Sequence, residues 1–282
     1  MTSVAPAAQK ALEERLAAAV PTSTLRRGRA PRLEQNILEC MTVGQMRAAT
    51  DEVAQGDGGE LKPGAGDLPP PLHSAYSSAA LAVNSFACWR GFESQLDLAG
   101  VHGFTGMAFE RKFPIFDGPR APNLDVVFEG PNDIVAVESK CTEHLSPKEA
   151  KFSAKYDDLD LRNRMHPSWR ELLETLGGDA RAFRLLDAGQ LVKHYLGLTR
   201  TLGTKSMTLV YLFWEPENST PIQTFLDHRA EVARFSDAVS SAPTRFVALS
   251  YPELWADWSS RAEPGWLGEH VEQLRARYSV SL

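Results

Sequence analysis

The segment that most constrains the fold is an unbroken apolar run, Met-Thr-Leu-Val-Tyr-Leu-Phe-Trp, over residues 207–214. A run without polar alternation is typical of a strand whose two faces are both covered. Residues 182–202 carry apolar side chains at helical spacing and predict a helix directly before it. A strand, a helical crossover and this strand together predict a parallel pair with a right-handed connection.

Three shorter strands are expected earlier in the chain, over residues 106–113, 124–128 and 134–140. The turn sequences Asp-Gly-Pro at 117–119 and Gly-Pro-Asn at 130–132 separate them, so they should form an antiparallel meander. Helical spacing predicts a helix over 74–98, with Ser74 as its N-cap. Helices over 224–239 and 268–278 and a strand over 245–250 complete an α/β fold with a mixed central sheet flanked by helices.

The chain before residue 73 has a different character. Helices are expected over 7–19 and 33–53, followed by a segment rich in glycine and proline over 55–72. We therefore predict an N-terminal helical appendage (1–54), a linker (55–72) and a main domain (73–282). Within that domain, the polar stretch 142–179 should be helical in pieces.

Composition excludes some classes of protein. The net charge of −6 argues against a protein that coats nucleic acid through a basic surface, although a local basic stripe can still guide a nucleic acid. Candidate stripes are Arg26, Arg27, Arg29 and Arg32 near the start, and Lys148, Lys151 and Lys155 further on. Solvated surface charge explains each group equally well.

Bulk properties also predict the compartment. No apolar run approaches the ~20 residues that cross a bilayer, and the start lacks a secretory pattern, so we expect a cytoplasmic protein without membrane contact. Three widely spaced cysteines, Cys40, Cys88 and Cys141, indicate neither a disulfide framework nor a zinc site.

The residues that carry chemistry lie on the second and third expected strands. Glu138 and Lys140 are two positions apart, so they project from the same face. In a symmetric hairpin, residues 128 and 134 flank the tip, which predicts Asp125 opposite Val137. A diagonal pair or a bulge would then bring the carboxylates of Asp125 and Glu138 together.

This set suits a metal site. Two carboxylates can hold Mg²⁺, for which Mn²⁺ is expected to substitute, and the Ser139 carbonyl is a candidate further ligand. Lys140 can orient or help deprotonate a water and offset charge on a phosphate in its transition state.

The pattern Asp125, twelve residues, then Glu138-Ser139-Lys140 resembles the signature of the PD-(D/E)XK nuclease superfamily. It is also similar to restriction endonuclease families in which the Glu-Ser-Lys strand continues into Thr-Glu, here Thr142-Glu143. Asn-Leu-Asp stands where the superfamily name has Pro-Asp. The resemblance covers about residues 74–214 and implies a restriction-endonuclease-like αβββαβ core. It further implies a metal-dependent endonuclease that hydrolyses DNA phosphodiester bonds, in restriction or phage defence.

Further site residues follow from the same resemblance. Gln190 and Tyr195 match a Gln and Tyr element of RecB-like members, although Tyr195 is as readily a core aromatic. Glu110 is argued from its neighbours instead: in Phe-Glu-Arg-Lys-Phe-Pro a charged residue among strand formers is expected only at an exposed or a functional position, so Glu110 is a candidate additional metal ligand. Glu93 matches the place where members supply an extra acid, but a solvated Glu at a helix end explains it better.

Two other functions stay open. One is a catalytically inactive nuclease fold that serves as a nucleic-acid-binding or scaffold module, and the other is a nuclease acting on RNA or single-stranded DNA. Cutting both strands of a duplex commonly needs two active sites, so the resemblance is compatible with a homodimer.

Overall fold

The computed structural model describes residues 4–20, 25–39, 41–56, 59–118, 121–203, 205–261 and 263–282. Its centre is a five-stranded sheet whose strands follow the order of the chain. They are β1 (Gly106–Lys112), β2 (Asn123–Glu129), β3 (Asp133–Lys140), β4 (Ser206–Phe213) and β5 (Arg245–Ser250). The first three are antiparallel, and β3, β4 and β5 are parallel, so the predicted mixed sheet is confirmed.

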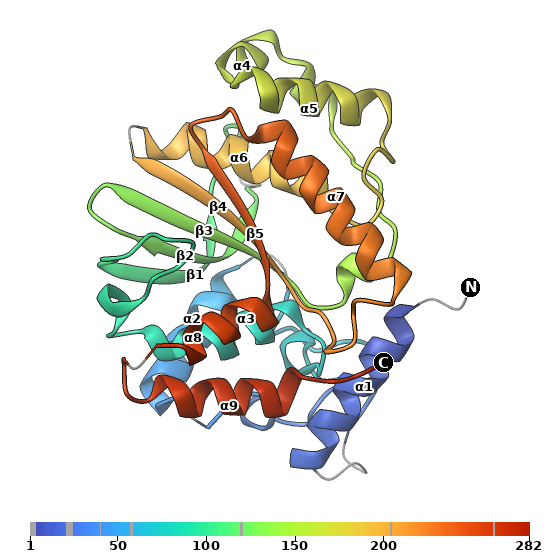
Figure 1. Cartoon of the computed structure of the whole chain (residues 1–282), viewed down its shortest axis with the longest axis vertical. Helices are drawn as coiled ribbons and strands as arrows, with labels where there is room; N and C mark the ends of the chain where they lie inside the picture. Colours follow the sequence, from blue (N-terminus) through green and yellow to red (C-terminus); the bar gives the residue numbers. More distant parts are fainter. Residues whose placement is uncertain are drawn as a thin grey trace.

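Helices cover both faces of the sheet (Figure 1). One face carries α5 (Pro167–Gly178), α6 (Ala188–Leu202) and α7 (Gln223–Val239), with α4 (Leu159–Arg164) beyond them. The other carries α1 (Val4–Ala19), α2 (Val43–Gln55), α3 (Ser78–Phe86), α8 (Tyr251–Ser259) and α9 (Leu267–Tyr278). Strand β4 is buried on both sides, since Val210 packs into one core cluster and Leu209 into the other. Both faces of β4 are therefore covered by other elements, as the apolar run predicts.

Several predicted helices are shorter in the structure. The helix expected over 33–53 is wrong in its first part, where a 3₁₀ turn over Leu33–Gln35 is followed by a break. Helix α2 begins only after Thr42, because the side chains of Thr42 and Gln45 cap each other's backbone amides. The helix expected over 182–202 begins at Ala188, where Asp187 caps it.

The helix expected over 74–98 is also shorter. Its N-cap is Ser77 rather than Ser74, because the Ser77 hydroxyl accepts the Ala80 amide at 3.1 Å. Helix α3 ends at Phe86, a 3₁₀ turn follows, and Gly91 has a φ of +90° that no helix accommodates. Glu93 therefore lies in a separate 3₁₀ turn and not near the end of that helix.

The N-terminal helices contact the main sheet layer. Leu12 of α1 belongs to the same core cluster as Leu274 of α9, and Glu52 of α2 accepts the Phe109 amide of edge strand β1 at 2.8 Å. This hydrogen bond occupies one of the amides that edge strand β1 would otherwise offer to another chain. The described residues of the 55–72 segment form turns, with a 3₁₀ turn from Pro71. The division of the chain at residues 54 and 72 stays a prediction.

In the described part of the chain, no helix has both the length and the apolar character needed to cross a membrane.

Candidate active site

The register of the β2–β3 hairpin places the two central acids opposite each other. Gly130 N donates to Asp133 O at 2.8 Å, and the pairs run from Glu129↔Ile134 to Val126↔Val137. The predicted register is therefore wrong by one residue, because the turn takes four residues rather than five. The next step of the ladder brings Asp125 to Glu138 instead of Val137, so the site requires no diagonal pairing.

Asp125 is fixed by the neighbouring strand. Its Oδ2 accepts the backbone amide of Ser139 at 2.7 Å, in the position between Glu138 and Lys140. The carboxylate thus replaces a backbone carbonyl at the end of the ladder and holds its strand against β3.

Glu110 reaches the same place from β1. The pairs on either side of it, Phe109↔Val126 and Arg111↔Leu124, leave it opposite Asp125. Its φ is +51°, a conformation that costs a non-glycine residue ~1–3 kcal/mol and concentrates at functional sites. Its Oε2 accepts the Asn123 side-chain amide at 3.1 Å.

The strained residue also redirects β1. Phe109 packs into the cluster that contains α3, whereas Phe113, four residues later, packs into the cluster that contains α6. In an undistorted strand both side chains would lie on one face. The distortion at Glu110 therefore turns the chain toward α6.

Lys140 joins the carboxylates to α6. Its Nζ donates to Glu138 Oε1 and, at 3.0 Å, to Gln190 Oε1. The exposed fraction is 2 % for Glu138 and 8 % for Lys140, so both side chains are almost completely shielded from solvent. Gln190 is thus brought to the predicted triad by the helical crossover between β3 and β4.

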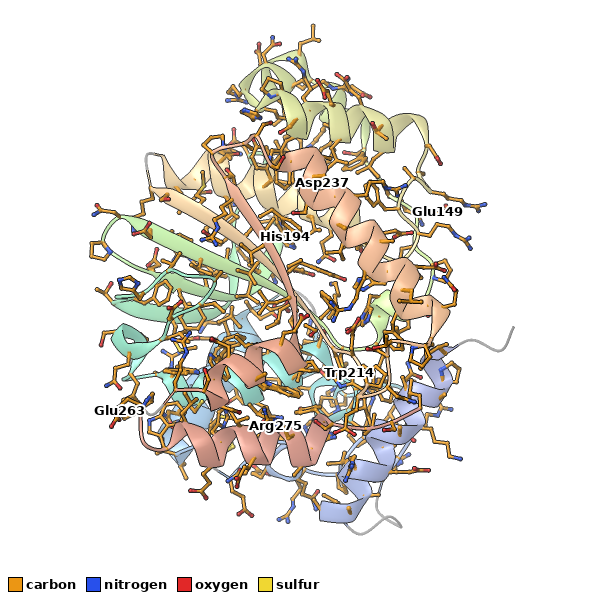
Figure 2. All side chains as sticks on the ribbon, viewed as in Figure 1. Glu149, His194, Trp214, Asp237, Glu263 and Arg275 are labelled. Carbon is orange, nitrogen blue, oxygen red and sulfur yellow. The ribbon has the colours of Figure 1, made fainter. Side chains whose placement is uncertain are left out.

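His194 is a site residue that the sequence patterns do not single out. Its Nε2 lies 2.8 Å from Glu138 Oε2, and the ring is fully buried. Figure 2 labels it in the interior of the molecule, between α6 and the sheet. It follows Gln190 by four positions, so both side chains lie on one helix face. That spacing is the signal that could have identified it.

The charges of these groups shift one another's pKa values. Burial would raise the pKa of Glu138, but Lys140 and His194 outweigh burial and lower that pKa to about 2. Burial raises the pKa of Asp125 well above its ordinary value, and the negative charge of Glu138 adds to the effect. Burial likewise raises the pKa of Glu110 to about 7, against the opposing hydrogen bond from Asn123.

Lys140 stays protonated at neutral pH. Burial would lower the pKa of its ammonium group, but Glu138 and Asp125 outweigh burial and raise it. In this arrangement Lys140 is a cation that can orient a water or offset negative charge.

The donor set fits a hard divalent cation by its chemistry. Carboxylate oxygens are the preferred ligands of Mg²⁺, and a cation would relieve the repulsion between Glu138 and Asp125 that raises the Asp125 pKa. No three acidic, histidine or cysteine side chains stand close enough to share an ion within the described ranges. Each Glu138 oxygen already contacts Lys140 or His194, so a cation would use the remaining lone pairs of this carboxylate.

Tyr195 does not face these groups. Its phenolic oxygen accepts the His166 amide at 2.9 Å, and its ring stacks on Trp169 with centroids 4.2 Å apart. Tyr195 lies in the core between α5 and α6, and its assignment to the site rests on the resemblance alone.

The Ser139 side chain also points elsewhere. Its Oγ donates to Ser78 O at 3.2 Å and lies 2.7 Å from the Tyr251 hydroxyl, on the opposite face of the sheet. A role for Ser139 as a ligand would involve its backbone carbonyl and stays a prediction. Glu93 Oε2 accepts the Gly91 amide at 2.9 Å within its own turn.

Comparison with known proteins identifies a family for this chain. The family model described as "Restriction Endonuclease associating with ARP" matches residues 21–279. No curated protein and no solved structure matches this chain significantly.

Proposed function

This chain belongs to the restriction endonuclease family described as associating with ARP, and on that premise we propose that it is a metal-dependent DNA endonuclease. The observation that carries the proposal is the meeting of Asp125 and Glu138 on adjacent strands beside a buried, protonated Lys140. Such a set serves phosphodiester hydrolysis, in which water attacks phosphorus and one P–O ester bond breaks.

Each residue has a role in this proposal. Asp125 and Glu138 hold the cation, with Glu110 and the Ser139 carbonyl as additional ligands. A bound Mg²⁺ would neutralise phosphate charge and supply a more acidic water. Lys140 orients that water and stabilises the charge that develops on phosphate, while Gln190 and His194 hold Lys140 and Glu138 in place.

The test is cleavage of supercoiled plasmid and linear duplex DNA with Mg²⁺ or Mn²⁺. We expect Asp125→Ala and Lys140→Ala to abolish cleavage while circular dichroism shows folded proteins. The control is Lys10→Ala, because Lys10 is exposed on α1 and should leave cleavage unchanged. Cleavage at the wild-type rate by both site variants would overturn the proposal.

A second candidate function has one observation in its favour. The carboxylate of Glu138 already forms contacts with Lys140 and His194. Within the described residues, no three acidic, histidine or cysteine side chains lie close enough to share a metal ion. An inactive nucleic-acid-binding module would have the same features. Calorimetric titration with Mn²⁺ separates the two, because absence of binding favours the inactive module.

The substrate and setting complete the proposal. A panel of labelled duplex DNA, single-stranded DNA and RNA tests whether duplex DNA is the preferred substrate. We propose a role in restriction or phage defence in the cytoplasm, action as a homodimer on duplex DNA, and association with the ARP that the family description names.

A further inference from the structure

A groove with a volume of about 730 Å³ is lined partly by residues that neighbour those of the candidate active site along the chain. One wall is formed by residues 115–118, 121 and 122 between β1 and β2. The other is formed by residues 151, 153, 155 and 156, which follow β3, and by Lys193 of α6. We define this lysine groove by six of its lining residues, Phe116, Pro122, Lys151, Lys155, Tyr156 and Lys193.

The groove adjoins the site on both walls. Pro122 immediately precedes Asn123, whose side chain binds Glu110. On α6, Lys193 precedes His194 and follows Gln190 by three positions, a spacing that puts their Cβ atoms about 5–6 Å apart. The groove is therefore connected to the site through Asn123 on one wall and through α6 on the other.

Its cations lack carboxylate partners. Lys151, Lys155 and Lys193 form no ion pair with any acid in the part of the chain that the structure describes. The acid in the described lining, Asp117, is bound by Arg200. Lys193 is half-buried, and burial lowers the pKa of its ammonium group despite the nearby charge of Asp187. An anion bound in the groove would offset the cost of burying this positive charge.

Two of these lysines have their ammonium groups close to aromatic rings. Lys155 Nζ lies 5.7 Å from the Phe116 ring centroid, and Lys193 Nζ lies 5.4 Å from that of Phe152. Tyr156 contacts both rings edge-on or tilted, with centroids 5.2 and 5.1 Å away. Lysines interleaved with aromatic rings are typical of surfaces that follow a nucleic-acid strand.

The groove also continues away from the site. A second hollow of about 710 Å³ shares Phe116 and Lys155 with it and extends to Arg164 and Arg200. This second hollow also contains Asp117, Asp157 and Asp158, so the excess of positive charge is confined to the lysine groove.

We propose that the lysine groove binds the sugar-phosphate backbone of substrate DNA next to the phosphate that is cut. This inference rests on the proposed function. It assigns the substrate contact to one local basic surface of an acidic chain, in which the lysines neutralise phosphates and release counterions.

The test removes three charges while keeping most of each aliphatic stem, in the variant Lys151→Gln/Lys155→Gln/Lys193→Gln. Binding to labelled duplex DNA is measured by fluorescence anisotropy in EDTA, at several KCl concentrations. We expect affinity to fall by about tenfold or more at 0.1 M salt, and the salt slope to fall by about 0.9 for each lysine that contacts a phosphate.

The matched control is Lys10→Gln/Arg47→Gln/Arg275→Gln, which removes the same charge from exposed positions on α1, α2 and α9. These helices cover the opposite face of the sheet, so affinity should change little. If the groove variant does not fold, the exposed Lys155→Gln alone should still lower the slope by about 0.9.

Failure of this inference differs from failure of the proposed function. If the wild type cuts DNA and the groove variant binds like the control variant, the groove assignment is overturned and the nuclease stands. If the wild type neither binds nor cuts DNA, the proposed function falls and this inference falls with it. A groove variant that loses affinity for RNA but not for DNA overturns DNA as the occupant.

Discussion

Asp125 is the residue at which stability and activity oppose each other. Its carboxylate is half-buried beside Glu138, and both desolvation and that neighbouring charge raise its pKa. Asp125→Asn removes the repulsion, yet the amide oxygen can still accept the Ser139 amide. We expect the metal-free variant to gain about 1 kcal/mol, a rise of about 2–4 °C in melting temperature.

Differential scanning fluorimetry in EDTA at pH 8 measures this change, and plasmid cleavage with Mg²⁺ should be abolished in the same variant. Adding Mn²⁺ should raise the melting temperature of the wild type but not of Asp125→Asn, because ligand binding stabilises only a protein that binds it. A lower melting temperature in EDTA would show that the Asp125 charge stabilises the fold.

His194 positions Glu138. Outer groups that orient a metal-binding carboxylate typically affect metal affinity or activity by ~10–100-fold. We expect His194→Ala to raise the Mg²⁺ concentration for half-maximal cleavage within that range, while His194→Gln, which keeps an N–H donor near Glu138 Oε2, restores part of the loss. Equal Mg²⁺ dependence in wild type and both variants would assign His194 to packing alone.

Single residues of the site were predictable to different degrees. Alternation along one strand, which is a local rule, predicts that Glu138 and Lys140 project from the same face. The short hairpin between the two strands predicts that Asp125 lies close to them. Their register depends on the length of one turn, which the turn residues left ambiguous by one position. The positive φ of Glu110 was not predictable, since strain in a strand is imposed by its tertiary surroundings.

At the scale of elements, α6 supplies Gln190 and His194 to the site and packs closely on the β1–β2 connection. A Cβ added at Gly197 would lie 2.4 Å from Phe113 O. Gly197→Ala must therefore push α6 away from this segment, and overpacking of this kind costs ~1–3 kcal/mol. We expect a melting temperature lower by several degrees and slower cleavage, because Gln190 and His194 move with the helix.

The matched control is Gly177→Ala in α5, where an added Cβ meets nothing within 4 Å. It should stabilise the protein by up to ~1 kcal/mol, since alanine is the better helix former. Thermal melting and cleavage of both variants check the prediction, and equal melting temperatures would contradict the close packing of α6.

Most elements were predictable, and the exceptions have local causes. The sequence Ser-Tyr-Pro-Glu at 250–253 is a capping box that begins α8 at the last residue of β5, without a loop. We predicted the strand and not this helix, because a helix directly after a strand leaves no turn signal. The helices that are shorter than expected begin at N-caps, Thr42, Ser77 and Asp187, which lie inside the predicted helical ranges.

At the scale of the whole molecule, distant parts of the chain are joined by buried polar contacts. The guanidinium of Arg277 on α9 donates to Asn36 Oδ1 at 2.9 Å, to Ala75 O at 3.1 Å and to Leu12 O at 3.3 Å. Periodicity within a segment predicts each helix but carries no information about contacts between residues so far apart. The packing of α1 on α9 was therefore not predictable.

The interior also makes the fold sensitive to acid through its buried histidines. His228 is fully buried beside Tyr211, and burial, with the charge of Arg229, lowers its pKa from 6.5 to about 3. Between those values the unfolded chain takes up a proton at His228 that the folded protein does not, so the free energy of unfolding falls as the pH falls below about 6.5.

The contribution of His228 can be separated from that of the site carboxylates by comparing wild type with His228→Gln, because the other groups titrate in both. At pH 7.5 the wild type should be the more stable, since Gln does not reproduce the hydrogen bond to Tyr211 and the ring packing. Urea unfolding between pH 7.5 and 4.5 should show that advantage shrinking by up to ~1.4 kcal/mol per pH unit below 6.5. A difference that stays constant over this range would mean that His228 takes up its proton in the folded protein as readily as in the unfolded chain.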